Sequence, residues 1–130
     1  MNLRFEPLSL EKAEDYLELY RACPRQSSYY SFGSLWAWRK VFGLSWAFAE
    51  GMCWIRSGGE NLWAPVGPWE DADWRSILPG VFPEPVKLHY APDGLVRVLT
   101  DLLRDRVAAR EVRSQWEYLH SVQELIALKG

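Results

Sequence analysis

The sequence is poor in cysteine and contains no long apolar run. Its 130 residues include only two cysteines, Cys23 and Cys53, too few for a disulfide framework or a tetrahedral thiolate metal site. We therefore expect both thiols to be reduced and structural. No stretch approaches the roughly 18 to 20 apolar residues of a membrane-spanning helix. Residues 1–6 lack the basic region and apolar run of a signal peptide. These absences predict no transmembrane segment and a cytoplasmic location.

Residues that commonly carry out catalysis are also scarce. The two histidines, His89 and His120, have no carboxylate or thiol partner close by in sequence and no metal-ligand spacing. We expect His89 to be half exposed on a strand and His120 to lie in a turn. Neither G-x-G-x-x-G nor G-x-x-x-x-G-K occurs, and residues 57–59 and 66–68 are typical of turns rather than phosphate cradles. The residues alone therefore identify no catalytic group, metal or cofactor.

Charge of one sign is not in excess either. Fifteen Lys and Arg residues stand against 17 Asp and Glu residues, giving a formal net charge of -2. This balance argues against a nucleic-acid-binding surface and a polybasic membrane surface. Glu70, Asp71 and Asp73 could do acid–base work as grouped carboxylates. Acidic residues are favoured at helix N-termini, however, so we expect a helix start there.

What the sequence does contain predicts one α+β domain. Its 130 residues, 48% hydrophobic and 25% charged, fit a single globular domain. Glu50 and Gly51 predict a hairpin turn, and Ser31 predicts a helix cap. The expected order is strand 3–7, a helix capped by Ser9, a helix over 31–40, strands 44–49, 52–56 and 61–66, a helix over 69–78, strand 86–90, a helix capped by Asp93, strand 112–118, and a helix opened by a capping box at 121–124.

The helices and strands are expected to pack as one layered structure. Strands 44–49, 52–56 and 61–66 predict an antiparallel meander within a mixed sheet. In the helix over 31–40, apolar residues extend well beyond one stripe, so we expect it to be buried on more than one side. The first helix has apolar residues at helical spacing, namely Leu10, Ala13, Leu17 and Tyr20.

The clearest excess is aromatic, with eight Trp, six Tyr and five Phe residues. Trp46, Trp54, Trp63 and Trp116 fall in predicted strands, where core packing explains them. The other tryptophans surround predicted helices, and a core of this size hardly encloses all eight, so we expect some at the surface. We interpret that surface as a protein or domain interface, with a ligand cleft as the alternative. The residues assigned to it are Tyr29, Tyr30, Trp36, Trp38, Arg39, Trp69 and Trp74.

Three segments resemble a bacterial protein family. Residues 31–38, with the serine-rich loop after Cys23 and Pro24, resemble the serine-phenylalanine signature of the family. Residues 62–67 resemble its aromatic-x-Pro-x-Gly strand end. Residues 116–130 resemble a further stretch of the family sequence. The family is of unknown function and is related to the C-terminal domain of phosphatidylglycerol lysyltransferase. The resemblance implies a GNAT-like (acyl-CoA N-acyltransferase-like) fold over residues 1–130, with a mixed, mostly antiparallel sheet flanked by helices. Family members resemble tandem GNAT-like proteins, so we expect this chain to be the N-terminal half of a longer protein.

The resemblance carries over the fold but no catalytic residue. A GNAT acetyl-CoA site has an Arg/Gln-x-x-Gly-x-Gly/Ala pattern between a strand and a helix, and residues 66–70 do not match it. The basic stretch of the family is expected beyond Gly130. Acyl-CoA or aminoacyl-tRNA as a ligand, and a second GNAT-like half as a partner, are therefore implied by the family alone.

Three functions stay open at this point. The first is a half-domain, non-catalytic alone, of an acyl- or aminoacyl-transferase-like protein, in which positioning of donor and acceptor matters most. The second is a self-sufficient N-acyltransferase with a divergent donor site, where backbone amides of residues 65–67 would hold a pyrophosphate. The third is an aromatic-rich interaction or ligand-binding module. Its exposed aromatic surface would bind a second half or form a homo-oligomer.

Overall fold

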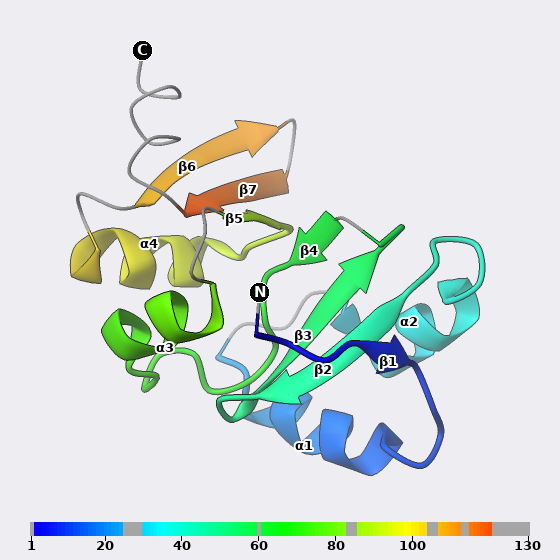
Figure 1. Cartoon of the computed structure of the whole chain (residues 1–130). Helices are drawn as coiled ribbons and strands as arrows, with labels where there is room; N and C mark the ends of the chain where they lie inside the picture. The colour runs from blue at the N-terminus through cyan, green and yellow to red at the C-terminus, as the bar shows by residue number, and fades with distance from the viewer. Residues whose placement is uncertain are drawn as a thin grey trace.

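The fold is built on one mixed β-sheet flanked by helices. The computed structural model describes residues 2–24, 30–59, 61–82, 86–103, 107–112 and 115–120. Within them, seven strands are hydrogen-bonded in the order β1-β2-β3-β4-β5-β7-β6 (Figure 1). Neighbouring strands are antiparallel except β4 and β5, which are parallel. The elements are β1 (Glu6–Pro7), α1 (Ala13–Ala22), α2 (Phe32–Trp38), β2 (Ser45–Ala49), β3 (Met52–Ser57), β4 (Asn61–Trp63), α3 (Trp74–Val81), β5 (Val86–His89), α4 (Asp93–Leu102), β6 (Val107–Val112) and β7 (Gln115–His120). The predicted α+β class is confirmed.

Strands β2, β3 and β4 form the antiparallel meander that the sequence predicts. Ala49 pairs with Met52 at the closed end of the β2–β3 hairpin. Between them, Glu50 and Gly51 have φ angles of 57° and 72°. Positive φ at both turn positions is the geometry of a type I′ turn, whose twist matches that of the flanking strands. The hairpin register is therefore set by these two residues.

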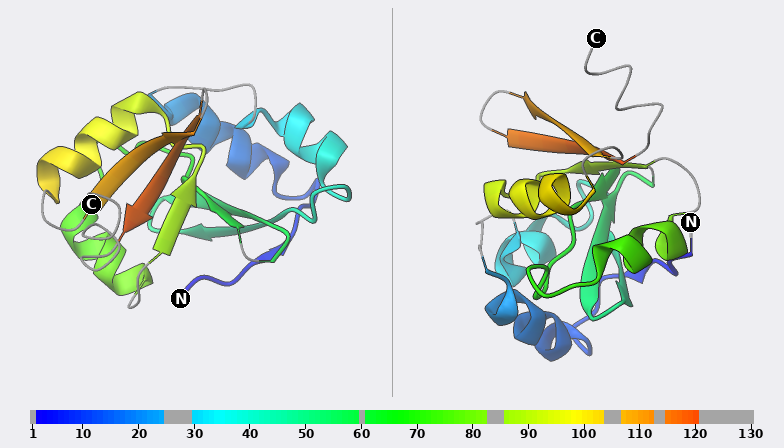
Figure 2. Two further views of the ribbon diagram at one scale, coloured as in Figure 1. Left: turned by 90° about the horizontal axis from the view of Figure 1, so that it is seen from above. Right: turned by 90° about the vertical axis from the view of Figure 1, so that its left-hand side faces the viewer.

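Strand β3 is buried on both faces, so helices cover the sheet from both sides. Because side chains alternate along a strand, Trp54 points to the face opposite that of its neighbours. Its ring lies edge-on to Phe82 and to Trp74 of α3, with centroids 5.3 Å and 6.3 Å away. On the other face, Trp46 of β2 stacks on Tyr16 of α1 at 5.5 Å. Helices α1 and α2 thus lie on one side and α3 on the other (Figure 2).

Helix α1 begins later than the sequence predicts, and its buried face is centred on Tyr16, with Tyr20 of the predicted face packed beside it. It starts at Ala13 rather than after Ser9, because a turn closed by the Ala13 N–H and the Leu10 carbonyl comes first. Leu10, expected in the apolar face, is exposed, and the buried residue of the helix is Tyr16. The Tyr16 hydroxyl donates a hydrogen bond to the Tyr30 carbonyl. A ring with a polar partner therefore replaces the predicted aliphatic contact.

Helix α2 has the predicted cap but not the predicted burial. Ser31 Oγ accepts a hydrogen bond from the Ser34 N–H at 3.3 Å, as an N-cap does. Leu35 is its buried residue, whereas Trp38 and the following Phe42 are about half exposed. The expectation that this helix is buried on more than one side is wrong. Its seven residues make about two turns, and it covers the sheet with one stripe only.

Two later elements also differ from the prediction. Helix α3 begins at Trp74 rather than near Trp69, which lies in the preceding loop. Strand β6 occupies a segment where the sequence predicts no strand, and pairs with β7 from Val107 to Val112. Its Ala, Arg and Glu residues favour helices in isolation, so its strand conformation depends on β7. The predicted final helix after residues 121–124 lies outside the described residues.

The cysteines and His89 have the predicted surroundings. Cys23 and Cys53 are free and buried. Burial raises the pKa of the Cys53 thiol above its ordinary value, which makes it a poor nucleophile and fits a structural role. His89 on β5 is partly buried. None of the described helices is long and apolar enough to cross a bilayer.

Gly67 lies just beyond β4, where the chain passes close to the β2–β3 hairpin. Its φ is 152°, and a Cβ there would lie 2.8 Å from Met52 Cγ. We expect Gly67→Ala to lower the free energy of unfolding by about 1–3 kcal/mol, because the added methyl overpacks a buried site. Urea denaturation measures this difference. Gly33→Ala in α2 is the control, since nothing lies within 4 Å of its added Cβ, and it should be neutral or stabilising. Equal losses in both variants would contradict this packing.

Three buried acids predict a loss of stability in alkali. Burial raises the pKa of Tyr16, Tyr30 and Cys53 above the ordinary values of 10.0 and 9.0. Below those ordinary pKa values the three groups are protonated in both the folded and the unfolded chain. Their titration then takes nothing from the stability of the fold. As the pH rises further, only the unfolded chain releases the protons, so the free energy of unfolding falls by about 1.4 kcal/mol per pH unit and group.

The urea midpoint is therefore expected to fall steadily above the ordinary thiol pKa. Tyr16→Phe should make that fall shallower, because one of the three acids is then missing. Urea unfolding followed at a series of alkaline pH values measures both slopes. A midpoint that does not change with pH, or an unchanged slope in Tyr16→Phe, would contradict the prediction.

Candidate functional site

The structure separates the predicted aromatic surface into several places. Tyr30, Trp69 and Trp74 expose only 6%, 1% and 0% of their surface, so the expectation that they belong to an exposed site is wrong. Each is covered by partners that lie far away in sequence. Tyr29 lies outside the described residues. Three of the predicted residues do reach the surface, on α2 and directly after it: Trp36, Trp38 and Arg39.

An exposed apolar group with neighbouring cations extends along the end of α2. Trp38, Val41 and Phe42 are 52%, 69% and 51% exposed. The rings of Trp38 and Phe42 contact each other, with centroids 5.5 Å apart. Exposed apolar side chains that form a contiguous group mark a binding surface. We call the following set the α2 surface: Trp36, Trp38, Arg39, Lys40, Val41 and Phe42.

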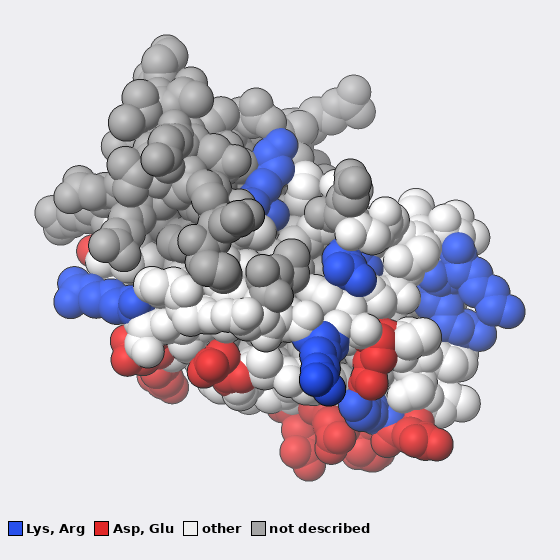
Figure 3. Space-filling model, viewed as in Figure 1, with Lys and Arg blue, Asp and Glu red and all other residues white. Residues whose placement is uncertain are grey.

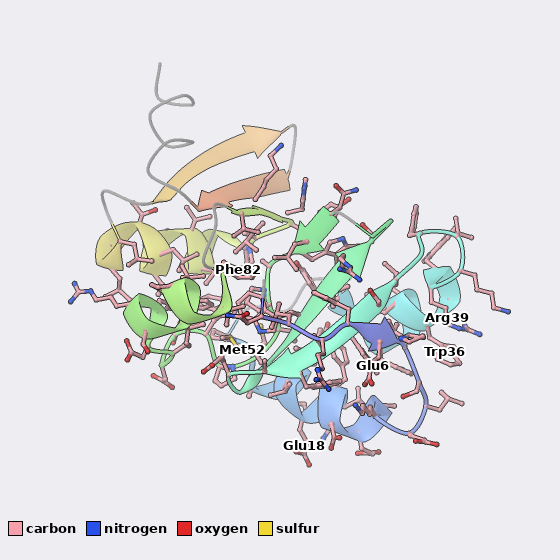
Figure 4. All side chains as sticks on the ribbon, viewed as in Figure 1. Glu6, Glu18, Trp36, Arg39, Met52 and Phe82 are labelled. Atoms are coloured by element: carbon pink, nitrogen blue, oxygen red, sulfur yellow. The ribbon has the colours of Figure 1, made fainter. Side chains whose placement is uncertain are left out.

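Arg39 is held in a defined position on this surface. Its guanidinium carbon lies 3.6 Å from the ring centroid of Trp36, a cation–π contact. Its Nη1 also donates to the Trp36 carbonyl at 2.5 Å. Trp36 stacks in turn on Phe32 at 5.8 Å, and Phe32 packs on the core residue Trp46 at 6.2 Å. The charge of Arg39 is therefore fixed at the flank of the molecule (Figure 4).

A second aromatic group, which no sequence motif marks, lies at the ends of the parallel strands β4 and β5. Trp63 meets Tyr90 edge-on at 4.9 Å and Tyr30 edge-on at 5.6 Å. The Tyr30 hydroxyl donates to the Tyr90 carbonyl at 3.1 Å. The carboxyl ends of parallel strands are where open sheets commonly bind ligands. In this protein, the buried Tyr30 lies over that position.

Tyr90 has a strained backbone within this group. Its φ is 58°, which is rare for a residue with a bulky side chain. Such a conformation persists where the surroundings enforce it, and here the ring of Trp63 and the hydroxyl of Tyr30 hold it. The sequence predicts Tyr90 as an ordinary strand residue on the same face as Leu88, with His89 on the other face. Nothing in the sequence signals the positive φ, because a neighbouring strand and a distant loop impose it.

Residues 64–73 join β4 to α3, and the backbone N–H groups of residues 64–69 are largely engaged. Those of Ala64, Val66 and Trp69 donate to backbone carbonyls at 2.8 to 2.9 Å. Pro65 and Pro68 have no N–H. A pyrophosphate cradle needs several free N–H groups that converge on one point. This junction does not fit a pyrophosphate.

Buried indoles and exposed carboxylates occupy the rest of the junction. Trp74 Nε1 donates to the Trp69 carbonyl at 2.8 Å. The Trp69 ring lies so close to α4 that a Cβ on Gly94 would be 2.7 Å from it. As the sequence predicts, acidic residues precede a helix, here α3. These residues are all exposed: Glu70, Asp71 and Asp73. Their negative charges would repel a phosphate group.

Comparisons with known proteins bear on the fold of the chain. No protein-family model matches it, and no curated protein does. Its structure is similar to that of a conserved protein of unknown function from Bacteroides thetaiotaomicron VPI-5482, with a TM-score of 0.68 and 16% sequence identity. The match covers 86% of this chain and 40% of that chain, so this chain spans less than half of the solved protein. A likeness at this identity shows a shared fold, and the family resemblance stays a prediction.

Trp69 and Trp74 offer a matched test of the junction. Trp74 Nε1 has a hydrogen-bond partner, whereas Trp69 Nε1 is buried with none among the described residues. Phenylalanine removes volume at either position, but Trp74→Phe also leaves the Trp69 carbonyl without that donor. We therefore expect Trp74→Phe to lose about 1 kcal/mol more free energy of unfolding than Trp69→Phe. Urea denaturation of both variants measures the difference. A larger loss in Trp69→Phe would contradict the assigned hydrogen bond.

Proposed function

We propose that the chain is a GNAT-like half-domain, non-catalytic on its own, that contributes binding surface to an acyl- or aminoacyl-transferase-like protein. The observation that carries this proposal is the junction between β4 and α3, where a GNAT-like protein would hold its acyl-CoA donor. Engaged N–H groups, the buried Trp69 ring and three carboxylates occupy that junction. Because these groups offer a pyrophosphate no cradle, the chain alone is expected not to bind the donor.

The GNAT-like part of the proposal rests on the order of elements and on the sheet. A strand, two helices, a three-stranded meander, a helix, a strand and a further helix follow one another, as the resemblance implies. The sheet is mixed and mostly antiparallel, with β4 and β5 as a parallel pair. The similar solved structure is longer, and the matched part is 40% of it. That share is in keeping with a half-domain.

A half-domain without acid–base residues can still contribute to GNAT-type transfer by binding and positioning. Such transfer depends mainly on holding the donor and the acceptor amine in position. In this proposal the α2 surface provides contact area for a second GNAT-like half or for a second copy. Acyl-CoA or aminoacyl-tRNA would then be a ligand of the whole assembly rather than of these residues.

Two other functions are alternatives. A self-sufficient N-acyltransferase with a divergent donor site is disfavoured, because the amides of residues 65–67 that it would use include one proline and the engaged Val66. An aromatic-rich interaction module is favoured by the exposed Trp38, Val41 and Phe42. This second alternative needs no transfer chemistry and relies on the α2 surface alone.

Isothermal titration with acetyl-CoA tests the proposal. We expect no binding in the micromolar range, because the N–H groups of Ala64, Val66 and Trp69 are engaged and the junction carries negative charge. A variant with Glu70→Gln, Asp71→Asn and Asp73→Asn is the matched control. If charge repulsion alone excluded acetyl-CoA, this variant would bind it. We expect that the variant does not bind acetyl-CoA either. Micromolar binding to the natural chain would overturn the proposal, and release of coenzyme A in the presence of amines would establish the self-sufficient transferase.

A further inference from the structure

Helix α1 carries an acidic face directed away from the sheet. Glu14, Asp15 and Glu18 are exposed, and Glu14 and Glu18, four positions apart, lie on one stripe of the helix. Figure 3 shows Asp and Glu side chains gathered along the lower edge of the molecule, where Figure 1 places α1. Glu18 points away from the sheet in Figure 4. We call Glu14, Asp15 and Glu18 the α1 acidic face.

The α2 surface lies beside the α1 acidic face and has the opposite charge. Helices α1 and α2 contact each other and lie on the same side of the sheet (Figure 2). Arg39 and Lys40 adjoin the exposed Trp38, Val41 and Phe42. Figure 3 shows Lys and Arg side chains at the flank where α2 lies. One side of the molecule therefore presents a cationic, apolar group next to an anionic one.

This arrangement favours a particular partner. A surface with neighbouring patches of opposite charge is complementary to a copy of itself rotated by a two-fold axis, because each patch then meets its opposite. An anionic membrane would attract Arg39 and Lys40, but it would repel the three carboxylates of the neighbouring α1 acidic face. A second copy satisfies both charges and also covers the apolar side chains.

We propose that two copies of this chain associate about a two-fold axis, with the α2 surface of each copy on the α1 acidic face of the other. Two equal contacts form, each with Arg39 and Lys40 of one copy against Glu14 and Glu18 of the other. Burial of the apolar side chains stabilises the pair, and the charges select its orientation. The inference rests on the proposed function for the role of the α2 surface as a contact area, and it deepens that function by naming a second copy as the partner.

Charge reversal gives a direct test by sedimentation velocity. At about 100 µM, we expect the natural chain to sediment as a dimer of about 30 kDa, twice its 15.1 kDa. The variant Glu14→Lys/Glu18→Lys and the variant Arg39→Glu/Lys40→Glu should each be monomeric, because like charges then meet in both contacts. Mixed in equal amounts, the two variants should form a dimer again, since both contacts then join opposite charges. Native mass spectrometry should find one chain of each kind in that dimer.

Controls separate this association from other causes. Lys87→Glu/Arg97→Glu places the same charge change on β5 and α4 and should leave the dimer intact. Trp38→Ala/Phe42→Ala should dissociate it while circular dichroism stays that of the natural chain. A monomeric natural chain, a reversed variant that remains dimeric, or a mixture that does not associate would each overturn the proposal.

Flotation of a monomeric natural chain with phosphatidylserine vesicles would assign the α2 surface to a membrane instead. Titration with acetyl-CoA reports on the proposed function separately, whatever the oligomeric state.

Discussion

Burial of strand β3 on both faces is the constraint on which the rest of the structure depends. A strand without a solvent face needs a packing layer on each side, and here both layers rely on aromatic rings. Trp54 meets Trp74 and Phe82 on one side, while Trp46 of the neighbouring strand meets Tyr16 on the other. Four consecutive residues of β3 expose no more than 1% of their surface: Met52, Cys53, Trp54 and Ile55.

The demands of this two-sided core explain where the tryptophans lie. Trp46, Trp54, Trp69 and Trp74 are almost completely buried, so most of the aromatic excess is used to fill space between layers. Indole rings cover a large area with few rotatable bonds, which suits a small domain with two packing interfaces. Of the two tryptophans of α2, Trp36 is partly buried against the core and Trp38 is about half exposed, because that short helix lies against the sheet through Leu35. Among the described residues, the exposed aromatic group is therefore smaller than the composition implies and lies at one helix end.

The same packing shapes what the protein can bind. Trp69 and Trp74 hold the loop between β4 and α3 against the core, and Tyr30 covers the ends of the parallel strands. Both of these positions are thus filled by side chains of the chain itself. Among the described residues, an exposed aromatic group lies at the end of α2, beside the exposed carboxylates of α1. This distribution supports the proposal that the chain contacts another protein surface rather than a phosphate-bearing donor.

Local signals in the sequence predicted the α+β class, the meander, the Glu50–Gly51 turn, the Ser31 cap and the burial of the cysteines, because these depend on neighbouring residues. The family resemblance and the function that it implies stay predictions, since the comparisons reach only the fold.

Only the tertiary structure decided which aromatic residues are exposed. The inward residue of α1 is Tyr16 rather than Leu10, Trp69 lies in a loop and is buried, and Tyr90 has a positive φ. Each outcome depends on partners that are distant in sequence. Strand β6 likewise depends on its pairing with β7, because its central Ala, Arg and Glu residues favour helices. Sequence periodicity reports which side chains prefer burial, but the packing of whole layers determines which of them find a partner.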